Sequence, residues 1–309
     1  MSGTFKCVDL FAGLGGQSTG AVMAGHQVIW AANHWPVAVE YHALNHPETQ
    51  HSCQDLQQAD FSQVPDHDVL LASPCCQGHS KAKGKNQARH DSSRSTAWAV
   101  VSAAEACRPD VLLIENVQEF MDWTLYPAWA DALARLGYTL SPHILDAADH
   151  GVAQNRVRLF MVGTRSKHPL QLNLEREPQV TARSIINLDD GNWSPIQKPK
   201  RSQATLARIE RGRKELGTDT FLIPYYGSGS GLTGRSLDRP IGTITTIDRW
   251  AVVHGDRMRM LTVSETRDFM SFPEATKLPK QKRLATHLLG NAVCPILERK
   301  ILKALPLVA

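Results

Sequence analysis

The sequence has 309 residues, of which 42% are hydrophobic and 21% are charged, and its formal net charge at pH 7 is +4. This composition is that of a folded globular protein and excludes an intrinsically disordered chain. No apolar run approaches the roughly 20 residues that a membrane-spanning helix needs, and the first residues lack the layout of a signal peptide. We therefore expect a cytoplasmic protein with one large domain, or with a core domain and a smaller one.

The spacing of the cysteines and the clustering of charge further narrow the possible classes of protein. The six cysteines form no CxxC pair and lie near no histidine pair at ligand spacing, so we expect neither a disulfide framework nor a metal site. Residues 195–215 carry seven Lys or Arg against two Glu, and a second basic stretch, HSKAKGKNQARH, begins at His79. Clustered basic charge fits a phosphate backbone as partner, although either cluster alone could equally be a solvated surface.

In chain order, the first 165 residues alternate short apolar runs with helix-like stretches. We predict strands at 5–11, 26–32, about 51–56, 68–72, 110–116, 140–147 and 158–164, and helices at 16–25, 35–45, 93–108 and 126–137. This alternation predicts an α/β fold with a doubly wound, mostly parallel sheet.

The pattern changes between about Ser166 and Asp238, where apolar runs are few, prolines are frequent and the longer basic stretch lies. We expect a small separate lobe or a set of loops there. Order resumes with RPIGTITT, and the stretches 259–273 and 287–305 are expected to supply helices that pack back onto the first domain. The predicted division is therefore 1–165, 166–238 and 239–309.

The first predicted strand runs into VDLFAGLGG, a glycine loop that precedes the first helix. At the carboxyl end of a strand in an open α/β sheet, glycines let the backbone approach a ligand. The spacing of Gly13, Gly15 and Gly16 differs from the G-x-G-x-x-G dinucleotide fingerprint, which disfavours NAD. Asp9 and Phe11 beside the loop suit a cofactor with a cationic end and a flat ring, such as S-adenosylmethionine.

A cysteine pair, Cys75 and Cys76, follows the predicted strand 68–72. A cysteine is more often a small buried hydrophobe, but a turn-rich loop at the ligand-binding edge favours a nucleophile. A thiol that attacks an electron-poor ring needs its thiolate, an acid near the ring nitrogen and a cation for the ring carbonyl. Glu115, Arg156 and Arg158 are candidates for the acid and the cation, although each alone would more often be a surface residue.

Together these motifs resemble the DNA (cytosine-5) methyltransferases. DLFAGLGG, the loop that ends in QGHS, IENV, QNRVR, RPIGTITT and GNAV occur in the order and rough spacing of that family, over all of the chain except about 166–238. The resemblance implies a Rossmann-like S-adenosylmethionine-dependent methyltransferase fold of the compact bacterial or phage type. It also implies that 166–238 is a small target-recognition region.

The cysteine loop matches the family pattern with two departures. Alignment on Gln77 and Ser80 implies that Cys76 is the nucleophile. Cys75 then stands where the family has proline, and His79 where it has an aromatic residue. An alignment on the Pro-Cys dipeptide would choose Cys75 instead.

The resemblance also implies the remaining catalytic roles. Cys76 would add to C6 of a cytosine flipped out of duplex DNA, Glu115 would bind N3 and the amino group, and Arg158 would bind the O2 side. Arg156 would support the catalytic loop. Residues implied to lie at the substrate are Gln77, Ser80, Asn116 and Gln154.

The implied cofactor is S-adenosyl-L-methionine. Its contacts would come from the glycine loop, from the ends of the second and third strands, and from the GNAV motif: Phe11, Gly13, Leu14, Gly15, Gly16, His34, Trp35, Asp55, Asn291 and Val293. His34 departs from the family, which has an acid there for the ribose hydroxyls. Histidine can still form a hydrogen bond with a hydroxyl.

The implied partner is double-stranded DNA, with no membrane and no metal, and a monomer is the default state. Three alternatives stay open: a catalytically silent DNA-binding relative, a transfer-RNA cytosine methyltransferase, and transfer of a modified group from a related sulfonium donor. The departures at His34, Cys75 and His79 keep the first alternative open, whereas Cys76, Glu115 and Arg158 argue against it. The sequence lacks the Cys-Phe-Thr motif of the transfer-RNA relatives, which disfavours the second.

Overall fold

The chain forms two compact units in a computed structural model that describes residues 3–75, 95–225 and 233–305. The first unit comprises Met1–Asp146, Val157–Arg176 and Ala292–Ala309, and the second comprises Ala147–Arg156 and Glu177–Asn291. Compactness alone defines these units. The functional division expected from the sequence therefore stays a prediction.

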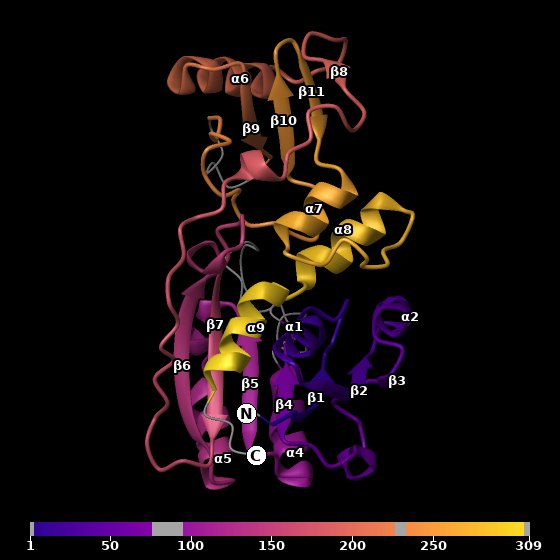
Figure 1. The fold of residues 1–309 in the computed structure, drawn as a ribbon, viewed down its shortest axis with the longest axis vertical. Coiled ribbons are helices and arrows are strands. Elements are labelled where there is room, and N and C mark those ends of the chain that lie inside the picture. Colours follow the sequence, from indigo (N-terminus) through magenta and orange to yellow (C-terminus); the bar gives the residue numbers. More distant parts are fainter. Residues whose placement is uncertain (1–2, 76–94, 226–232, 306–309) are drawn as a thin grey trace. The chain divides into compact units, whose positions relative to one another are not determined.

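The first unit is built on a seven-stranded sheet in the order β3-β2-β1-β4-β5-β7-β6 (Figure 1). Its strands are β1 Lys6–Leu10, β2 Gln27–Asn33, β3 Gln50–Cys53, β4 Val69–Ala72, β5 Val111–Asn116, β6 Thr139–Asp146 and β7 Val157–Thr164. The pairs from β3 through β5 are parallel, and β7 runs antiparallel to both of its neighbours. The predicted α/β fold with a mostly parallel sheet is confirmed.

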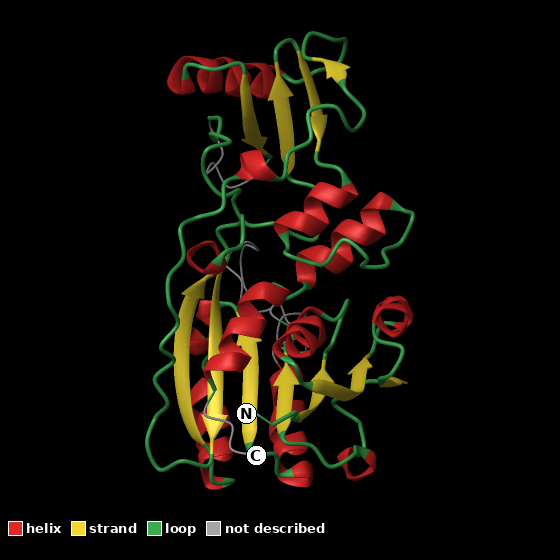
Figure 2. Ribbon diagram, in the orientation of Figure 1, coloured by secondary structure: helices red, strands yellow, loops and turns green. Residues whose placement is uncertain are grey.

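Helices cover both faces of this sheet (Figure 2). They are α1 Gly16–Ala24, α2 Pro36–Asn45, α4 Trp98–Cys107, α5 Tyr126–Arg135 and α9 Pro295–Ala304. α1 and α9 pack against each other on one face, and α4 and α5 contact each other on the opposite face. The C-terminal helix α9 therefore completes the first unit, although it is far from α1 in sequence.

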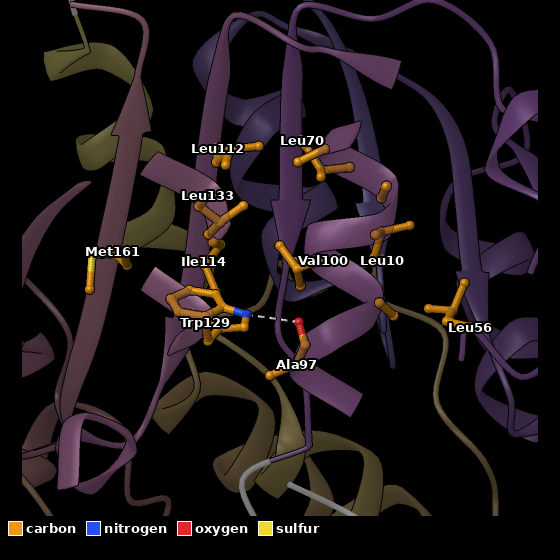
Figure 3. Close-up of a cluster of buried hydrophobic side chains, with 14 of the residues drawn as sticks. Leu10, Leu56, Leu70, Ala97, Val100, Leu112, Ile114, Trp129, Leu133 and Met161 are labelled. Carbon is orange, nitrogen blue, oxygen red and sulfur yellow. Dashed lines mark hydrogen bonds between the residues drawn. The ribbon is translucent and has the colours of Figure 1, made fainter. Parts of the chain in front are cut away.

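The core between the sheet and the helices α4 and α5 is apolar. Strands covered on both faces are hydrophobic throughout, and β4 is buried at every position. Leu112 and Ile114 of β5 pack with Val100 of α4 and Trp129 of α5 (Figure 3). The Trp129 indole nitrogen donates a 2.9 Å hydrogen bond to the Ala97 carbonyl, so this large buried side chain leaves no polar atom unsatisfied.

The second unit holds an antiparallel sheet in the order β8-β11-β10-β9. Its strands are β8 Ser194–Pro195, β9 Thr220–Pro224, β10 Trp250–His254 and β11 Arg257–Met260, and its helices are α6 Gln203–Leu216, α7 Val263–Phe269 and α8 Lys282–Asn291. The sheet includes β10 and β11, which lie beyond Asp238 in the sequence. The predicted helical stretch 259–273 is helical only over α7.

The basic stretch of the second unit forms the helix α6. The Ser202 hydroxyl caps its first turn, and Gly217 in a left-handed conformation ends it. Ile209 of α6 packs with Phe221 of β9. Gly212 lies so close to that ring that a Cβ there would be 2.5 Å from it.

Candidate active site

The glycine loop joins β1 to α1 at the carboxyl edge of the parallel strands. Phe11, Gly13 and Gly15 have positive φ angles of 60°, 57° and 95°. A positive φ is strained for phenylalanine, and such strain is concentrated at ligand-binding turns. The Gly15 amide closes the turn by donating to the Ala12 carbonyl at 2.8 Å. Leu14 is buried as a whole residue, so its contact with a cofactor stays a prediction.

Gly16 brings Val293, the last residue of the GNAV motif, beside the glycine loop. A Cβ on Gly16 would be 2.2 Å from the carbonyl oxygen of Val293, so packing admits no side chain there. Val293 itself is buried in the first unit. Asn291 ends α8 in the second unit and is exposed, and its contact with a cofactor stays a prediction.

His34, Trp35 and Asp55 follow β2 and β3 at the same edge of the sheet. The Gln54 amide donates to the Asn33 carbonyl at 3.1 Å, which holds the two strand ends together. The Asn33 side chain accepts a 3.0 Å hydrogen bond from the Trp35 amide. Trp35 is half-buried, whereas His34 and Asp55 are exposed.

Glu115 and Arg158 form an ion pair near the end of β5. The Arg158 Nε lies 3.2 Å from Glu115 Oε1, and the two side chains are 17% and 10% exposed. Phe160 of the antiparallel strand β7 lies opposite Glu115, so Arg158, two residues away, projects to the same face. The guanidinium compensates a carboxylate that would otherwise be unstable in this position. An acid and a cation are thus side by side at the edge that carries the glycine loop.

Asn116 fixes the start of the cysteine loop. Its amide nitrogen donates to the Pro74 carbonyl at 3.1 Å, and its amide oxygen accepts from the Val117 amide at 2.9 Å. The Cys75 amide donates to Thr96 Oγ1 at 3.2 Å. The chain is therefore held on both sides of the segment 76–94.

The predicted nucleophile Cys76 lies outside the described residues, as do Gln77, His79 and Ser80. Cys75 is described, and it is a partly buried free cysteine. The choice of Cys76 over Cys75 therefore stays a prediction.

Gln154 and Arg156 brace the backbone of the second unit. The buried Gln154 donates to the Phe269 carbonyl at 2.9 Å and accepts from the Ile244 amide at 2.7 Å. The Arg156 guanidinium donates to the carbonyls of Ile244 at 3.0 Å and Gly290 at 3.1 Å. These contacts tie the RPIGTITT segment to the start of GNAV, and the roles expected of Arg156 at the catalytic loop and of Gln154 at the substrate stay predictions.

A buried hydrogen-bond chain lies beside the glycine loop, and sequence reasoning missed it. Asp9 of β1 is fully buried and accepts a 2.6 Å hydrogen bond from Ser18 Oγ. His42 Nε2 lies 3.0 Å from that hydroxyl, and His42 Nδ1 lies 2.7 Å from His51 Nε2. Because Ser18 donates to Asp9, we assign the Nε2 proton of His42 to the Ser18 bond and the Nε2 proton of His51 to the bond with His42.

Burial sets the charge state of this chain. Burial raises the pKa of Asp9 to about 7, although the hydrogen bonds from Ser18 oppose the rise. Burial and neighbouring histidines lower the pKa of His42 well below its usual value and that of His46 to about 4. The histidines are therefore neutral near pH 7. The sequence signal was the spacing of four residues between His42, in the last turn of α2, and His46, directly after it, whose ring centroids lie 4.7 Å apart.

The part of the chain that the structure describes contains neither a candidate membrane-spanning helix nor a candidate metal-binding cluster. None of its helices is long and apolar enough to cross a membrane. Over the same ranges, no group of three or more His, Cys, Asp or Glu side chains is arranged to hold a metal ion.

Comparisons with known proteins agree with the motifs. A family model described as C-5 cytosine-specific DNA methylase matches residues 5–306. The chain is 27% identical to the Type II methyltransferase M.NlaX of Neisseria lactamica over 96% of this chain and 95% of that one. It is 30% identical to the Type II methyltransferase M.HaeII of Haemophilus aegyptius over 94% and 89%.

A structural comparison supports the same fold. The solved structure of a prophage-encoded E. coli protein matches with a TM-score of 0.72 at 20% identity, over 97% of this chain and 98% of that one. At this identity the likeness concerns the fold. Because the family model spans nearly the whole sequence, the chain belongs to the C-5 cytosine-specific DNA methylase family.

Proposed function

We propose that the protein transfers the methyl group of S-adenosylmethionine to C5 of a cytosine flipped out of duplex DNA. The observation that carries the proposal is the largely buried pair of Glu115 and Arg158, 3.2 Å apart, at the sheet edge that also bears the glycine loop. An acid and a guanidinium side by side can bind two neighbouring polar edges of one pyrimidine ring. One edge consists of N3 and the exocyclic amino group, and the other is O2.

The glycine loop fits S-adenosylmethionine. Its two glycines with positive φ form a turn in which the backbone can approach a ligand closely. Trp35 and Asp55 would hold the adenine, and His34 would bind the ribose hydroxyls. Phe11 and Val293 would be among the other contacts. When bound, the cofactor supplies an electrophilic methyl group on a sulfonium.

The chain's own residues would supply the rest of the chemistry. The Cys76 thiolate adds to C6, and the electrons of the C5–C6 double bond move onto C5. Glu115 at N3 and Arg158 at O2 stabilise the negative charge that develops on the ring. After C5 has accepted the methyl group, loss of the C5 proton to a base and departure of the thiolate restore the ring. Gln154 and Arg156 would support the backbone around the site.

The decisive experiment supplies tritiated S-adenosylmethionine with either duplex DNA or transfer RNA. We expect label in DNA, recovered as 5-methylcytosine by mass analysis of the nucleosides. Label in transfer RNA alone would refute the DNA substrate, and a different added mass would indicate a modified donor. Cys76→Ser should abolish transfer, whereas Cys75→Ala should retain much of it. The reverse result would mean that the cysteine loop is aligned wrongly by one residue.

Covalent trapping separates an enzyme from a silent DNA-binding relative. Duplex DNA with 5-fluorocytosine at the target, incubated with S-adenosylmethionine, should form an adduct that survives denaturing electrophoresis. After methyl transfer, C5 carries fluorine in place of the proton whose removal would release the thiolate. Glu115→Gln should lower kcat by about 10²-fold or more, since positioned acid groups typically contribute that much. Thermal unfolding of this variant checks that the loss is not due to misfolding.

A further inference from the structure

Glu298 of α9 is buried where three motifs of the proposed site meet. Its Oε1 accepts a 3.2 Å hydrogen bond from the side-chain nitrogen of Gln17. Gln17 is also buried and lies in the first turn of α1, directly after the glycine loop. The same nitrogen is 3.5 Å from the carbonyl oxygen of Leu113 on β5, two residues before Glu115. One side-chain amide therefore links the helix of the glycine loop, the strand of the acid and the helix that follows GNAV.

Two glycines on α1 allow α9 to come close enough for this contact. A Cβ on Gly20 would lie 2.5 Å from Glu298 Cβ and 2.9 Å from the Pro295 carbonyl oxygen. Gly16, one turn earlier, approaches the Val293 backbone in the same way. Glycine weakens a helix interior, so Gly20 indicates that close packing of α1 on α9 outweighs the stability of α1 itself.

The surroundings of Glu298 favour its uncharged form. Burial raises the pKa of Glu298 well above its usual value, the Gln17 hydrogen bond opposes the rise, and the carboxylates of Asp9 and Glu115 raise it further. Cys7 of β1 also interacts with it electrostatically, and α1 contributes no charged residue. A protonated carboxyl can also donate. Glu298 Oε2 and Gln17 Oε1 have no partner among the described residues, and a second, reciprocal hydrogen bond would join these two atoms.

We propose that Glu298 is a positioning residue which, paired with Gln17, holds the first turn of α1 against β5 and so fixes the glycine loop relative to Glu115. Its effect on catalysis rests on the proposed function, whereas its effect on the loop concerns the protein alone. A displacement of about 1 Å at a reacting centre can slow a reaction about 10²-fold. Glu298 would thus influence methyl transfer without touching the substrate or the cofactor.

Three variants distinguish positioning from simple packing. Glu298→Gln keeps the shape and the hydrogen bonding of the protonated acid, and it should retain kcat/KM within about twofold. Glu298→Met fills a similar volume without polar atoms, and it should lower kcat/KM about tenfold or more. Ile301→Val is the control, because Ile301 is a fully buried residue of the same helix outside the pair. It should lower the melting temperature and leave kcat/KM unchanged.

Hydrogen exchange tests the same proposal without DNA or cofactor. Glu298→Met and Gln17→Leu should each speed amide exchange in residues 11–16 and 113–116, and the double variant should behave like either single one. Ile301→Val should affect α9 alone. Faster exchange confined to α9 in Glu298→Met, or unchanged kcat/KM in that variant, would overturn the proposal. A wild-type protein that is inactive on DNA would instead refute the proposed function and leave the exchange result valid.

Discussion

Two serine–aspartate hydrogen bonds of equal length lie in opposite surroundings. Ser18 donates to Asp9 at 2.6 Å in the interior, and Ser62 donates to Asp60 at 2.6 Å on the surface. Water can replace a lost partner only at the surface. We therefore expect Ser18→Ala to lower the free energy of unfolding by about 1–3 kcal/mol, because the Asp9 carboxyl and the His42 ring lose a partner.

Ser62→Ala is the matched control for this prediction, and it should leave the free energy of unfolding unchanged within error. Urea unfolding of both variants near neutral pH provides the measurement. Equal effects would show that water or another group reaches the buried chain.

The buried Asp9 should also make stability depend on pH. Its pKa is about 7 in the folded protein, against an ordinary value of 3.8, so the folded state binds more protons between these values. The stabilising contribution of Asp9 is then fully present below about pH 4, and it is lost as the pH rises through about 7. Asp9→Asn removes this loss. The variant should equal the wild type near pH 4 and exceed it near pH 8 by up to about 4 kcal/mol.

Thermal unfolding from about pH 4 to pH 8 checks the Asp9 prediction. Burial also raises the pKa of Glu298, so this residue contributes a loss of the same sign. The comparison should therefore be repeated in a Glu298→Gln background. A difference between Asp9→Asn and wild type that stays constant with pH would contradict the raised pKa.

At the scale of elements, the contact of α1 with the segment that leads into α9 depends on Gly16. A Cβ there would meet the oxygen and the nitrogen of Val293 at 2.2 Å and 2.9 Å, and backbone atoms can move away only if α9 shifts. We expect Gly16→Ala to lower the melting temperature and to weaken S-adenosylmethionine binding about tenfold or more, although alanine is the better helix former.

Gly217→Ala separates backbone strain from this clash. Gly217 has a φ of 62°, and a Cβ there meets nothing within 4 Å, so the substitution introduces strain of about 1–2 kcal/mol without collision. Calorimetric titration with the cofactor and thermal unfolding compare the two variants. If Gly16→Ala is no worse than Gly217→Ala, the glycine loop adapts and the close contact is dispensable.

The elements of the first unit could be predicted because the sequence signals that specify them lie within each element. A strand buried on both faces leaves an apolar run, and residues 110–116, DVLLIEN, predict β5, Val111–Asn116, with an error of one residue. Each predicted strand of that sheet is present, with ends that differ by three residues or fewer. Helix α5 matches its predicted start at Tyr126 because Pro127 and the spacing of apolar residues mark the first turn.

The antiparallel sheet could not be predicted in the same way, because its strands depend on distant partners. β11 reads RMRM, which looks like a charged surface segment. Arg259 is nevertheless buried there, because Glu265 pairs with it at 2.7 Å and the two side chains are only 1% and 3% exposed. Burial of a charge that is compensated by another element leaves no periodic signal in the sequence.

At the scale of the whole molecule, the motifs predict which residues belong to the site, but not what holds them. The resemblance indicated Glu115 and Arg158, and the structure brings their charged atoms within 3.2 Å. Gln17 and Glu298 carry no motif and are separated by 281 positions. Their contact depends on how α1 packs on α9, which sequence periodicity does not encode.

The uneven charge of the molecule leads to a prediction about DNA binding. The chain has a net charge of +4. On the basic helix α6, two adjacent cationic side chains differ in their exposure and in their ion pairing. Lys214 is exposed, whereas the Arg213 guanidinium lies 3.1 Å from Asp219 and 3.4 Å from Asp256. If α6 contacts phosphates, Lys214→Gln should reduce the slope of log affinity against log salt by about 1, because one fewer counterion is released.

Arg213→Gln is the internal control on the same helix. Because its charge is already compensated within the second unit, we expect this substitution to lower the melting temperature and to leave the salt slope unchanged. Fluorescence anisotropy with duplexes of several sequences, over salt from about 50 to 200 mM, measures the slope. A Lys214 contact to phosphate should weaken binding to every duplex alike, since phosphates carry no base information. A slope that neither variant changes would remove these two cations from the DNA interface, and a change with Arg213→Gln alone would mean that its ion pairs open when DNA binds.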